Sequence, residues 1–393
     1  MIFGDVPELP WITVGWGVGW RRQPGYGLPI RREHAVQFEV QPSATPVDAR
    51  TRAGVLAAPT FGRVFTDHMV TADWTEADGW HDARLTAYAP VLIDPASVVL
   101  HYGQTVFEGL KAYRQPGGGV ALFRPERNAA RLARSCARLA LPAFPEAAFV
   151  EACELLVSTD LAWVPDAEGA SLYLRPFMYA TEVGLGVRPS ESARFQVIAS
   201  PAGNYFSGPL RPVSLWLSQE YVRAAPGGTG AAKCGGNYAA GLVAQQEAVE
   251  HGCDQVVYLD AVERRWLEEL GGMNVFLVLD DGSLVTPELG TILDGITRDS
   301  VITLAREMGH PVEERRVDVD EWRKGALDGR VVEVFACGTA AVITPIGALR
   351  WPRGEAVAGT GEPGAVTMAL RSALLDVQYG RTTDTHRWMH PVV

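Results

Sequence analysis

Short apolar runs alternate along the chain with segments in which apolar residues recur every three or four positions. The short runs predict buried strands, and the longer period predicts helices with one apolar face. We expect strands at residues 97–101, 119–123, 170–178, 193–199, 213–217, 255–259, 275–279 and 331–335. This alternation of strands and helices predicts a mixed α/β protein.

The expected helices carry recognisable start and stop residues. One begins at Pro125, with Glu126 in its first turn, and places Leu132, Cys136 and Leu139 on one face. Proline and an acid both favour the first turn of a helix. Further helices are expected near residues 149–157, 238–249, 296–308 and 366–377, the last three ending at Gly252, Gly309 and Gly380.

Turn-forming residues are dense at positions 201–209, between two expected strands. Such a stretch predicts a connection between domains. We therefore expect a small α/β domain at residues 46–202, a connection at 203–212 and a large domain at 213–393.

Residues 1–45 differ from the rest, because Trp11 and Trp16 stand among many Gly and Pro residues without any sustained period. We expect an irregular extension here. It is either an ordered segment or upstream sequence translated from an early start codon. Met69 lies too far along to be the true start if residues 61–68 form a strand.

The composition narrows the classes of protein. With 393 residues, of which 47% are hydrophobic and 21% charged, the chain is typical of globular proteins. A net charge of −11 argues against nucleic acid as a partner. Five widely spaced cysteines without a Cys-x-x-Cys pair indicate neither a disulfide framework nor a zinc site, so no metal is expected. No apolar run reaches about 18 residues and no signal peptide is evident, so we expect a cytoplasmic protein that does not span a membrane.

Lys233 lies in the segment TGAAKCGGNY, residues 229–238. A lysine that bonds to a bulky planar aldehyde needs small neighbours, and it needs a phenol or carboxylate nearby. A phosphate-binding loop would need Gly-Lys-Ser/Thr, and a dinucleotide fingerprint would need a glycine where Lys233 stands. Taken alone, the segment also fits a surface lysine in a glycine-rich loop.

Four other places carry possible chemistry, and each also has a plain structural explanation. Glu269 precedes a Gly-Gly turn, where it either faces a cleft or is a solvated carboxylate. Residues 295–300 open a helix, whose free N–H groups suit a phosphate or only a capping threonine. Residues 338–340 (GTA) offer N–H groups and a hydroxyl, or only a turn. Arg114 is a phosphate partner or a surface charge.

In this order, the segments resemble the branched-chain aminotransferase family of fold-type IV pyridoxal-phosphate enzymes over about residues 60–390. The resemblance rests on residues 100–114 (LHYGQTVFEGLKAYR), 123–125 (FRP), 173–176 (YLRP), 182–187 (EVGLGV), 229–238, 269–274 (ELGGMN), 295–298 (GITR) and 338–340. It implies a two-domain α/β (α+β) fold, with a smaller N-terminal α/β domain and a larger C-terminal domain that binds pyridoxal 5′-phosphate.

The resemblance also implies roles for single residues. Lys233 would bond to the cofactor and move the proton between the substrate Cα and the cofactor's C4′ carbon. Glu269 would keep the pyridine nitrogen protonated, and Tyr238 would hydrogen-bond the 3′ oxygen. The residues expected to hold the phosphate are Arg114, Ile296, Thr297 and Thr339.

Substrate recognition is implied in the same way. The expected substrate-binding residues are Tyr102, Phe107, Tyr173, Arg175, Leu185, Val187, Tyr205, Thr339 and Ala340. Of these, Tyr102, Leu185 and Val187 would act across a homodimer interface. The chain departs from many relatives at Gly272, where they carry a hydroxyl residue, and it has Ala341 and Thr344 where some have a redox-active Cys-x-x-Cys pair.

The resemblance implies transfer of the amino group of L-leucine, L-isoleucine or L-valine to 2-oxoglutarate, giving branched-chain 2-oxo acids and L-glutamate. The alternatives on the same fold are a D-amino-acid aminotransferase, an (R)-amine transaminase and an aminodeoxychorismate lyase. Residues 100–114 and 173–176 favour the branched-chain reading. A protein that only binds a phosphorylated ligand is a further alternative, against which Lys233 and Glu269 argue.

Overall fold

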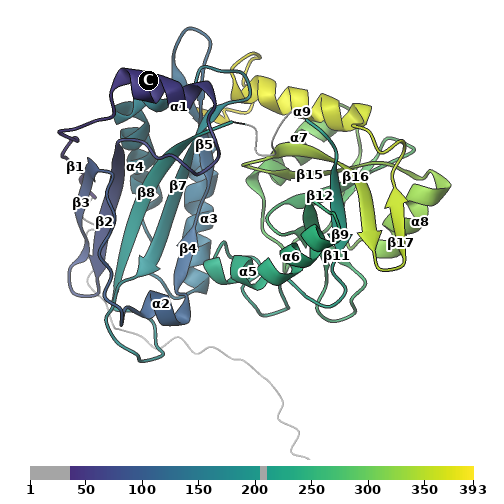
Figure 1. Ribbon diagram of the computed structural model, residues 1–393, viewed down its shortest axis with the longest axis horizontal. Helices are drawn as coiled ribbons and strands as arrows, with labels where there is room; N and C mark the ends of the chain where they lie inside the picture. Colours follow the sequence, from purple (N-terminus) through teal and green to yellow (C-terminus); the bar gives the residue numbers. More distant parts are fainter. Residues whose placement is uncertain (1–35, 204–209) are drawn as a thin grey trace, which may run out of the picture. The chain divides into compact units, whose positions relative to one another are not determined.

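The computed structural model describes residues 36–203 and 210–393, and its helices and strands are labelled in Figure 1. The described strands form two sheets of nine strands each, with helices packed against them. The predicted mixed α/β fold is therefore confirmed.

The first sheet collects strands from the N-terminal half of the chain, in the order β1-β3-β2-β8-β7-β5-β6-β18, with β4 paired to β7. Its strands are β1 (Glu39–Val40), β2 (His68–Thr75), β3 (Gly79–Ala87), β4 (Thr105–Phe107), β5 (Leu110–Arg114), β6 (Val120–Phe123), β7 (Ser171–Ala180), β8 (Ser192–Ala202) and β18 (Met389–Pro391). The helices before β7 are α1 (Ala49–Ala57), α2 (Val98–Tyr102), α3 (Pro125–Arg138), α4 (Glu146–Thr159) and the short 3₁₀ helix η1 (Leu161–Trp163).

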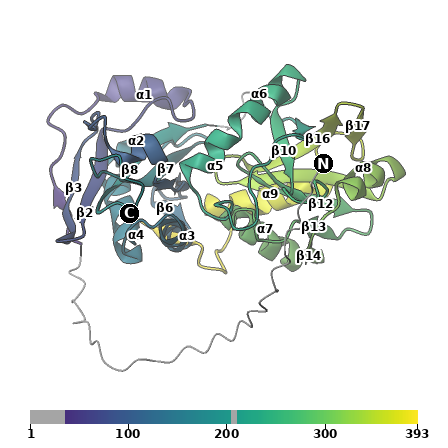
Figure 2. The ribbon, with the colours of Figure 1, turned by 90° about the horizontal axis from the view of Figure 1, so that it is seen from below.

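Apolar spacing explains how α3 and α4 are placed. Leu132 and Cys136 of α3 and Phe149, Cys153 and Leu156 of α4 are buried in one core with the sheet. The two helices pack against each other, and α4 also contacts β2 and β8, as Figures 1 and 2 show. This core fixes the end of β4 and the face of α3 that reach the site described below.

The second sheet has the order β11-β10-β9-β16-β15-β12-β13-β14, with β17 paired to β16. Its strands are β9 (Val213–Leu217), β10 (Gln255–Leu259), β11 (Leu267–Leu270), β12 (Asn274–Leu279), β13 (Leu284–Thr286), β14 (Val312–Glu314), β15 (Val331–Gly338), β16 (Val342–Trp351) and β17 (Gly354–Val357). Its helices are α5 (Gly235–Ala240), α6 (Leu242–Glu250), α7 (Ile296–Glu307), α8 (Val319–Asp328) and α9 (Ala365–Gln378). Helices α7 and α9 pack on β15, and α6 packs on β9 and β10.

The chain returns to the first sheet at its end. Strand β18 pairs antiparallel with β6, with Met389 opposite Phe123. His390 of β18 also lies in ion-pair contact with Glu126 of α3 and Glu154 of α4. The last strand of the chain therefore belongs to the sheet formed mostly by its first half.

Several predicted elements differ from the structure. Residues 97–101 do not form a strand, because Ser97 starts a single helical turn, α2, that ends at Gly103 in the left-handed conformation. Residues 61–68 are mostly turn, and β2 begins only at His68. The helix expected at 238–249 is broken between α5 and α6 at Gly241.

The N-terminal segment and the domain connection are only partly described. Within the segment expected to be irregular, β1 pairs parallel with β3. Most of the expected connection at 203–212, including Tyr205, lies outside the described residues. The domain boundaries stay a prediction.

No helix in the described part of the chain combines the length and the apolar character needed to cross a membrane. No group of three or more His, Cys, Asp or Glu side chains in this part is arranged to hold a metal ion. All five cysteines are buried and free.

Candidate active site

A cavity of about 160 Å³ is lined by residues from both sheets and from the loops between their strands. The first sheet and its helices contribute Phe107, Gly109, Arg131, Tyr173 and Arg175. The rest of the lining includes Phe61, Lys233, Tyr238, Glu269, Gly272, Asn274, Leu293, Gly295, Ile296, Thr297, Cys337, Gly338, Thr339 and Ala340. Most of the residues expected at the site are thus brought together.

Lys233 is held by its backbone, so its side chain is free to reach the cavity. Its N–H donates to the Ser135 hydroxyl at 3.0 Å, and its carbonyl accepts from the Phe107 N–H at 2.9 Å. Its Nζ lies 3.0 Å from the Tyr238 hydroxyl and 4.9 Å from the centre of the Phe107 ring. The predicted pair of lysine and phenol five residues apart is therefore within hydrogen-bonding distance.

Glu269, on β11, also lines the cavity and is 3% exposed. Its carboxylate is 2.8 Å from the Arg223 guanidinium and accepts from the Leu293 N–H at 2.9 Å and the Asn274 amide at 3.2 Å. Burial raises the pKa of Glu269, and the Arg223 guanidinium, the Leu293 N–H and Lys233 oppose that rise. Glu269 is thus a buried acid in a cationic surrounding, not a solvated turn residue.

The start of α7 faces the cavity through Ile296 and Thr297. The N–H groups in the first turn of a helix have no partner within the helix and attract anions. Gly295, before this turn, has no room for a side chain, because a Cβ there would lie 2.0 Å from the Asn274 side-chain oxygen. The glycine therefore lets the start of the helix sit against the strand that carries Asn274.

The Thr339–Ala340 turn connects β15 and β16 beside this helix start. It is held from behind by Lys111, whose Nζ donates to the Ala340 carbonyl at 2.9 Å. Burial, followed by the nearby Arg371, lowers the pKa of Lys111 to about 7. The turn offers its backbone N–H groups and the Thr339 hydroxyl to the cavity.

Arg131 of α3 is the arginine that lines the cavity beside the start of α7. Its guanidinium makes two bonds to Glu108, at 2.7 and 2.8 Å, and a third to the Asp294 carbonyl at 3.0 Å. Burial raises the pKa of Glu108, but Arg131, Lys233 and Asn128 outweigh it and hold that pKa below its ordinary value. Arg131 is therefore a fixed cation at the wall of the site.

Arg175 and Tyr173, which also line the cavity, offer groups that suit a carboxylate. Arg175 donates to the Tyr173 hydroxyl at 3.1 Å and lies over the Phe107 ring, 4.8 Å from its centre. Its buried Nε has no hydrogen-bond partner among the described residues. Gly109 allows Tyr173 to come close, because a Cβ at this position would lie 2.0 Å from the tyrosine hydroxyl.

Comparison of the sequence with known protein families identifies the kind of site. The sequence profile of the family described as amino-transferase class IV matches residues 105–349, more than half of the chain. The chain belongs to this family. The resemblance inferred from the motifs is confirmed.

Relatives of this class IV aminotransferase are similar along nearly their whole length. A probable branched-chain-amino-acid aminotransferase of Streptomyces coelicolor is 58% identical over 355 residues, which cover 90% of this chain and 98% of that protein. The branched-chain-amino-acid aminotransferase of Mycolicibacterium smegmatis is 56% identical over 359 residues, with the same coverage.

Solved structures give the same family. The Escherichia coli branched-chain amino acid aminotransferase matches with a TM-score of 0.69 and 30% identity, covering 82% of this chain and 99% of that one. The holo-form, with PLP, of the branched-chain amino acid aminotransferase from Thermobaculum terrenum matches with a TM-score of 0.65 and 27% identity, covering 83% and 98%. The fold-type IV prediction is confirmed.

One residue expected at the phosphate is not brought to the cavity of this aminotransferase. Arg114 donates to the carbonyls of Leu161 and Val164, at 3.2 and 3.1 Å, and pairs with Asp166 at 2.9 Å. Neighbouring side chains of a strand point to opposite faces. Lys111 of the same strand, β5, reaches Ala340 in the cavity wall, and Arg114 is three positions further on, so its side chain lies on the other face.

Three of the residues expected to line the pocket are exposed in a single chain. Tyr102, Leu185 and Val187 are 44%, 66% and 83% exposed, and none of them lines the cavity. The Tyr102 hydroxyl donates to the Leu185 carbonyl at 2.5 Å, so the first two lie together.

Sequence reasoning missed Arg131, Arg223 and Asn274. Arg131 is one of several arginines in α3, and nothing in the sequence distinguishes it from the others. Asn274 ends a segment that the motifs did mark, ELGGMN, but no role was assigned to it. Arg223 carries no local signal, because its partner Glu269 is 46 positions away in the sequence.

Proposed function

We propose that the protein uses pyridoxal 5′-phosphate to transfer the amino group of L-leucine, L-isoleucine or L-valine to 2-oxoglutarate. The observation that carries the proposal is the Lys233 amine, 3.0 Å from the Tyr238 hydroxyl, in one cavity with the buried acid Glu269. The names of the similar proteins support the substrate class.

The donor set fits this cofactor. The first turn of α7 at Ile296 and Thr297, the Thr339 hydroxyl and the Arg131 guanidinium offer donors for a phosphate. Glu269 would accept the pyridine N–H, and Tyr238 would donate to the ring oxygen. Bound there, pyridoxal phosphate supplies a sink for the electron pair left when the substrate Cα loses its proton.

Lys233 would take this proton and return it. Its Nζ is fixed near Tyr238 and over the Phe107 ring, so the amine needs no large movement to act as base and then as acid. Arg223 would keep Glu269 ionised, because its guanidinium opposes the rise in pKa that burial causes. Lys233 would thus transfer the proton, while Glu269 and Arg223 would stabilise charge.

Substrate recognition would rest on a feature common to both substrates. Every amino acid and 2-oxo acid in the reaction has a carboxylate beside the reacting carbon. Arg175, the Tyr173 hydroxyl and the Thr339–Ala340 turn offer donors to this carboxylate. The Phe107 ring supplies an apolar wall for the side chain. Tyr205 and the second subunit would complete that wall.

Two chains would form the complete site. Tyr102 contacts Leu185, and the two segments that carry them also carry the exposed apolar side chains of Leu100, Val183 and Val187. Contiguous exposed apolar surface is typical of a protein interface. We therefore propose a homodimer in which Tyr102, Leu185 and Val187 close the partner's cavity, and we place it in the cytoplasm because its five cysteines are unpaired.

The test is to locate the bound cofactor and to rank the amino donors. Borohydride reduction of the holoenzyme followed by peptide mass spectrometry should place the cofactor on Lys233 and not on Lys111 or Lys324. With 2-oxoglutarate as acceptor, L-leucine, L-isoleucine and L-valine should exceed a D-amino acid and a simple (R)-amine in kcat/KM. Cofactor on another lysine, or a preference for the D-amino acid or the amine, would contradict the proposal.

A further inference from the structure

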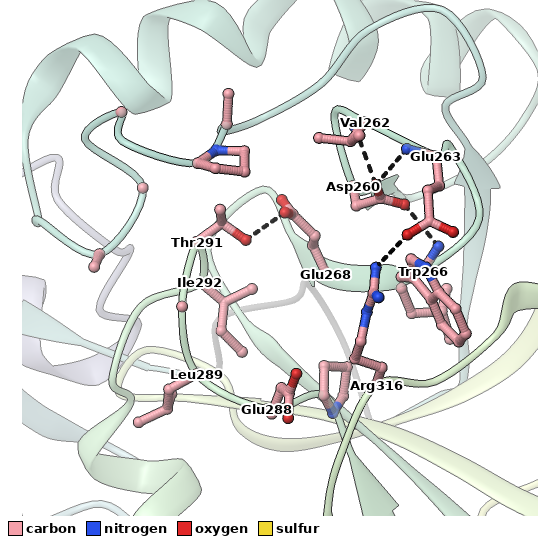
Figure 3. A pocket seen from close by; sticks show the side chains of 18 of the residues that line it. Asp260, Val262, Glu263, Trp266, Glu268, Glu288, Leu289, Thr291, Ile292 and Arg316 are labelled. Carbon is pink, nitrogen blue, oxygen red and sulfur yellow. Dashed lines mark hydrogen bonds and ion pairs between the residues drawn. The ribbon is translucent and has the colours of Figure 1, made fainter. Parts of the chain in front are cut away.

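A larger cavity, of about 540 Å³, lies outside the site described above and shares none of its lining residues. Figure 3 shows it from close by. Its volume falls in the range of about 300–1,000 Å³ that is usual for small-molecule sites. The walls come from the loop at 225–231, from the turn between β10 and β11, and from residues 287–292.

Its charged residues leave an excess of negative charge. Four carboxylates line it, from Asp260, Glu263, Glu268 and Glu288, against the single guanidinium of Arg316. Arg316 is already paired with Glu263 at 2.8 Å. The charge left over in the cavity is therefore carried by the other three carboxylates.

The carboxylate of Asp260 is occupied by hydrogen bonds from backbone N–H groups. It accepts from the N–H groups of Val262, Glu263, Arg265 and Trp266, at 2.7 to 3.0 Å. Burial raises the pKa of Asp260, but these N–H groups outweigh it and bring the pKa to about 2. Asp260 thus shapes the turn and leaves Glu268 and Glu288 as the available acceptors.

Glu268 is the decisive residue. It is 4% exposed, and the Thr291 hydroxyl donates to its Oε1. Its Oε2 is buried and has no hydrogen-bond partner among the described residues. In Figure 3 the carboxylate stands between Thr291 on one side and the Asp260 and Trp266 group on the other. A buried acceptor without a partner destabilises a protein unless a ligand or water satisfies it.

The remaining lining defines the ligand. The apolar side chains of Pro226, Val262, Leu289 and Ile292 border the same space. The carboxylates are spread around it, and no three acidic side chains of the described residues converge as a metal site requires. An organic cation with a short apolar part suits these walls better than a bare metal ion.

We propose that this cavity is a binding site for a small aliphatic ammonium ion, whose N–H donates to Oε2 of Glu268 while Glu288 faces its charge from the rim. This binding site does not depend on the proposed transamination. It is connected to the cavity around Lys233 through Thr291, whose carbonyl accepts from Arg223 at 2.7 Å. Arg223 is also the arginine that pairs with Glu269.

Calorimetry on the holoenzyme tests the site with N,N-dimethylbutylamine, a tertiary amine that is protonated at neutral pH and cannot condense with an aldehyde. The neutral N,N-dimethylbutanamide is the comparison ligand. We expect saturable binding of the amine at one per chain, and an affinity for the amide that is at least about tenfold weaker, because hydrogen bonds between charged groups are the strong ones.

Three variants make the test specific. Glu268→Gln should weaken amine binding by about tenfold or more, and the exposed Glu288→Gln by a few-fold. Glu247→Gln is the matched control, because Glu247 of α6 also has a buried oxygen without a partner but does not line the cavity. It should bind the amine as the wild type does. Absence of saturable binding to the wild type, equal binding of amide and amine, or unchanged binding of the amine to Glu268→Gln would overturn the proposal.

Discussion

Two parts of the cavity around Lys233, the end at the Glu269 carboxylate and the end at the Arg175 guanidinium, differ in how completely these two groups are paired. At one end, three donors, from Arg223, Leu293 and Asn274, reach the Glu269 carboxylate. At the other end, the Arg175 guanidinium donates a hydrogen bond to Tyr173, and its Nε has no hydrogen-bond partner among the described residues. A saturated group is fixed in place, whereas a group with a spare donor can bind a ligand that comes and goes.

This difference separates two kinds of mutational effect. Changes at the saturated end should affect turnover for every substrate, because they disturb groups that hold or serve the cofactor. Changes at the open end should alter the choice among substrates.

Lys233→Ala should lower kcat by about a thousandfold or more, because it removes both the covalent anchor and the base. The fold should persist, since the lysine is held by backbone bonds that alanine keeps. The measurement is steady-state transamination with circular dichroism as the check on folding. Lys324→Ala, at a side chain that is 72% exposed, is the control and should be fully active. Comparable activity of the two variants would show that Lys233 is neither the covalent anchor nor the base.

Glu269→Gln should lower kcat on the order of a hundredfold, because a neutral amide no longer stabilises a protonated pyridine. The cofactor should remain bound, since the phosphate donors at α7 and Thr339 are untouched. Turnover and cofactor content are measured on the same preparation. Loss of the cofactor together with the activity would show that Glu269 contributes mainly to binding.

Arg223→Gln should lower activity about tenfold and move the acidic limb of the pH profile upward. Burial raises the pKa of Glu269 and the Arg223 guanidinium opposes that rise, so without the guanidinium the pKa rises further and Glu269 becomes ionised only at higher pH. The variant should also be less stable by about 3–5 kcal/mol, because a buried carboxylate loses its partner. The measurements are kcat against pH and urea unfolding.

Arg223→Lys is the matched control for this prediction. It keeps the charge while losing the two bonds from the guanidinium to the Gly230 and Thr291 carbonyls. The acidic limb should stay near its wild-type position. If both variants shift the limb equally, the effect is due to the position of the loop and not to charge.

At the open end, L-leucine should exceed L-alanine in kcat/KM by on the order of a hundredfold or less. Each CH₂ of the substrate side chain that is buried against Phe107 contributes about 0.8 kcal/mol to binding. An apolar pocket therefore discriminates only modestly between side chains of different length. Parallel assays with one acceptor measure the ratio. Equal values for the two amino acids would show that this wall does not contact the side chain.

The smallest effect is expected for Gly272→Ser. A Cβ at this position would lie 3.5 Å from the Tyr238 ring, an ordinary contact, so the variant should fold. The added hydroxyl should lower kcat/KM for L-methionine and L-phenylalanine by a few-fold relative to L-leucine. An unchanged ratio would show that the space beside Gly272 is not used by the substrate.

The sequence predicted best those elements whose signal is local. Residues 213–217 and 255–259 are apolar runs between turns, and they coincide with β9 and β10. The pair of Lys233 and Tyr238 was also visible, because a spacing of five residues at the start of α5 brings them together. A short run such as 97–101 fits one turn of helix as well as a strand, and the Gly103 stop decided for the helix.

The residues that sequence reasoning missed depend on tertiary contacts. Arg223 reaches Glu269 only because the loop before α5 folds back on β11. Arg131 reaches the cavity because the packing of α3 turns that face of the helix inward, whereas Arg114 shares the face of β5 whose Leu110 and Ala112 are buried in the core with α3 and α4. Most of the residues taken from the family motifs line the cavity, but a motif does not record which way a strand faces.

The pairing of β18 with β6 has a consequence for synthesis of the protein. β6 ends at Phe123 and β18 begins at Met389, so the whole second sheet is made between them. Because the ribosome adds residues from the N-terminus, the hydrogen-bonding edge of β6 stays unpaired while the second sheet is synthesised. The first sheet can therefore be completed only after every strand of the second sheet has been synthesised, and until then the edge of β6 is open to pairing with other strands.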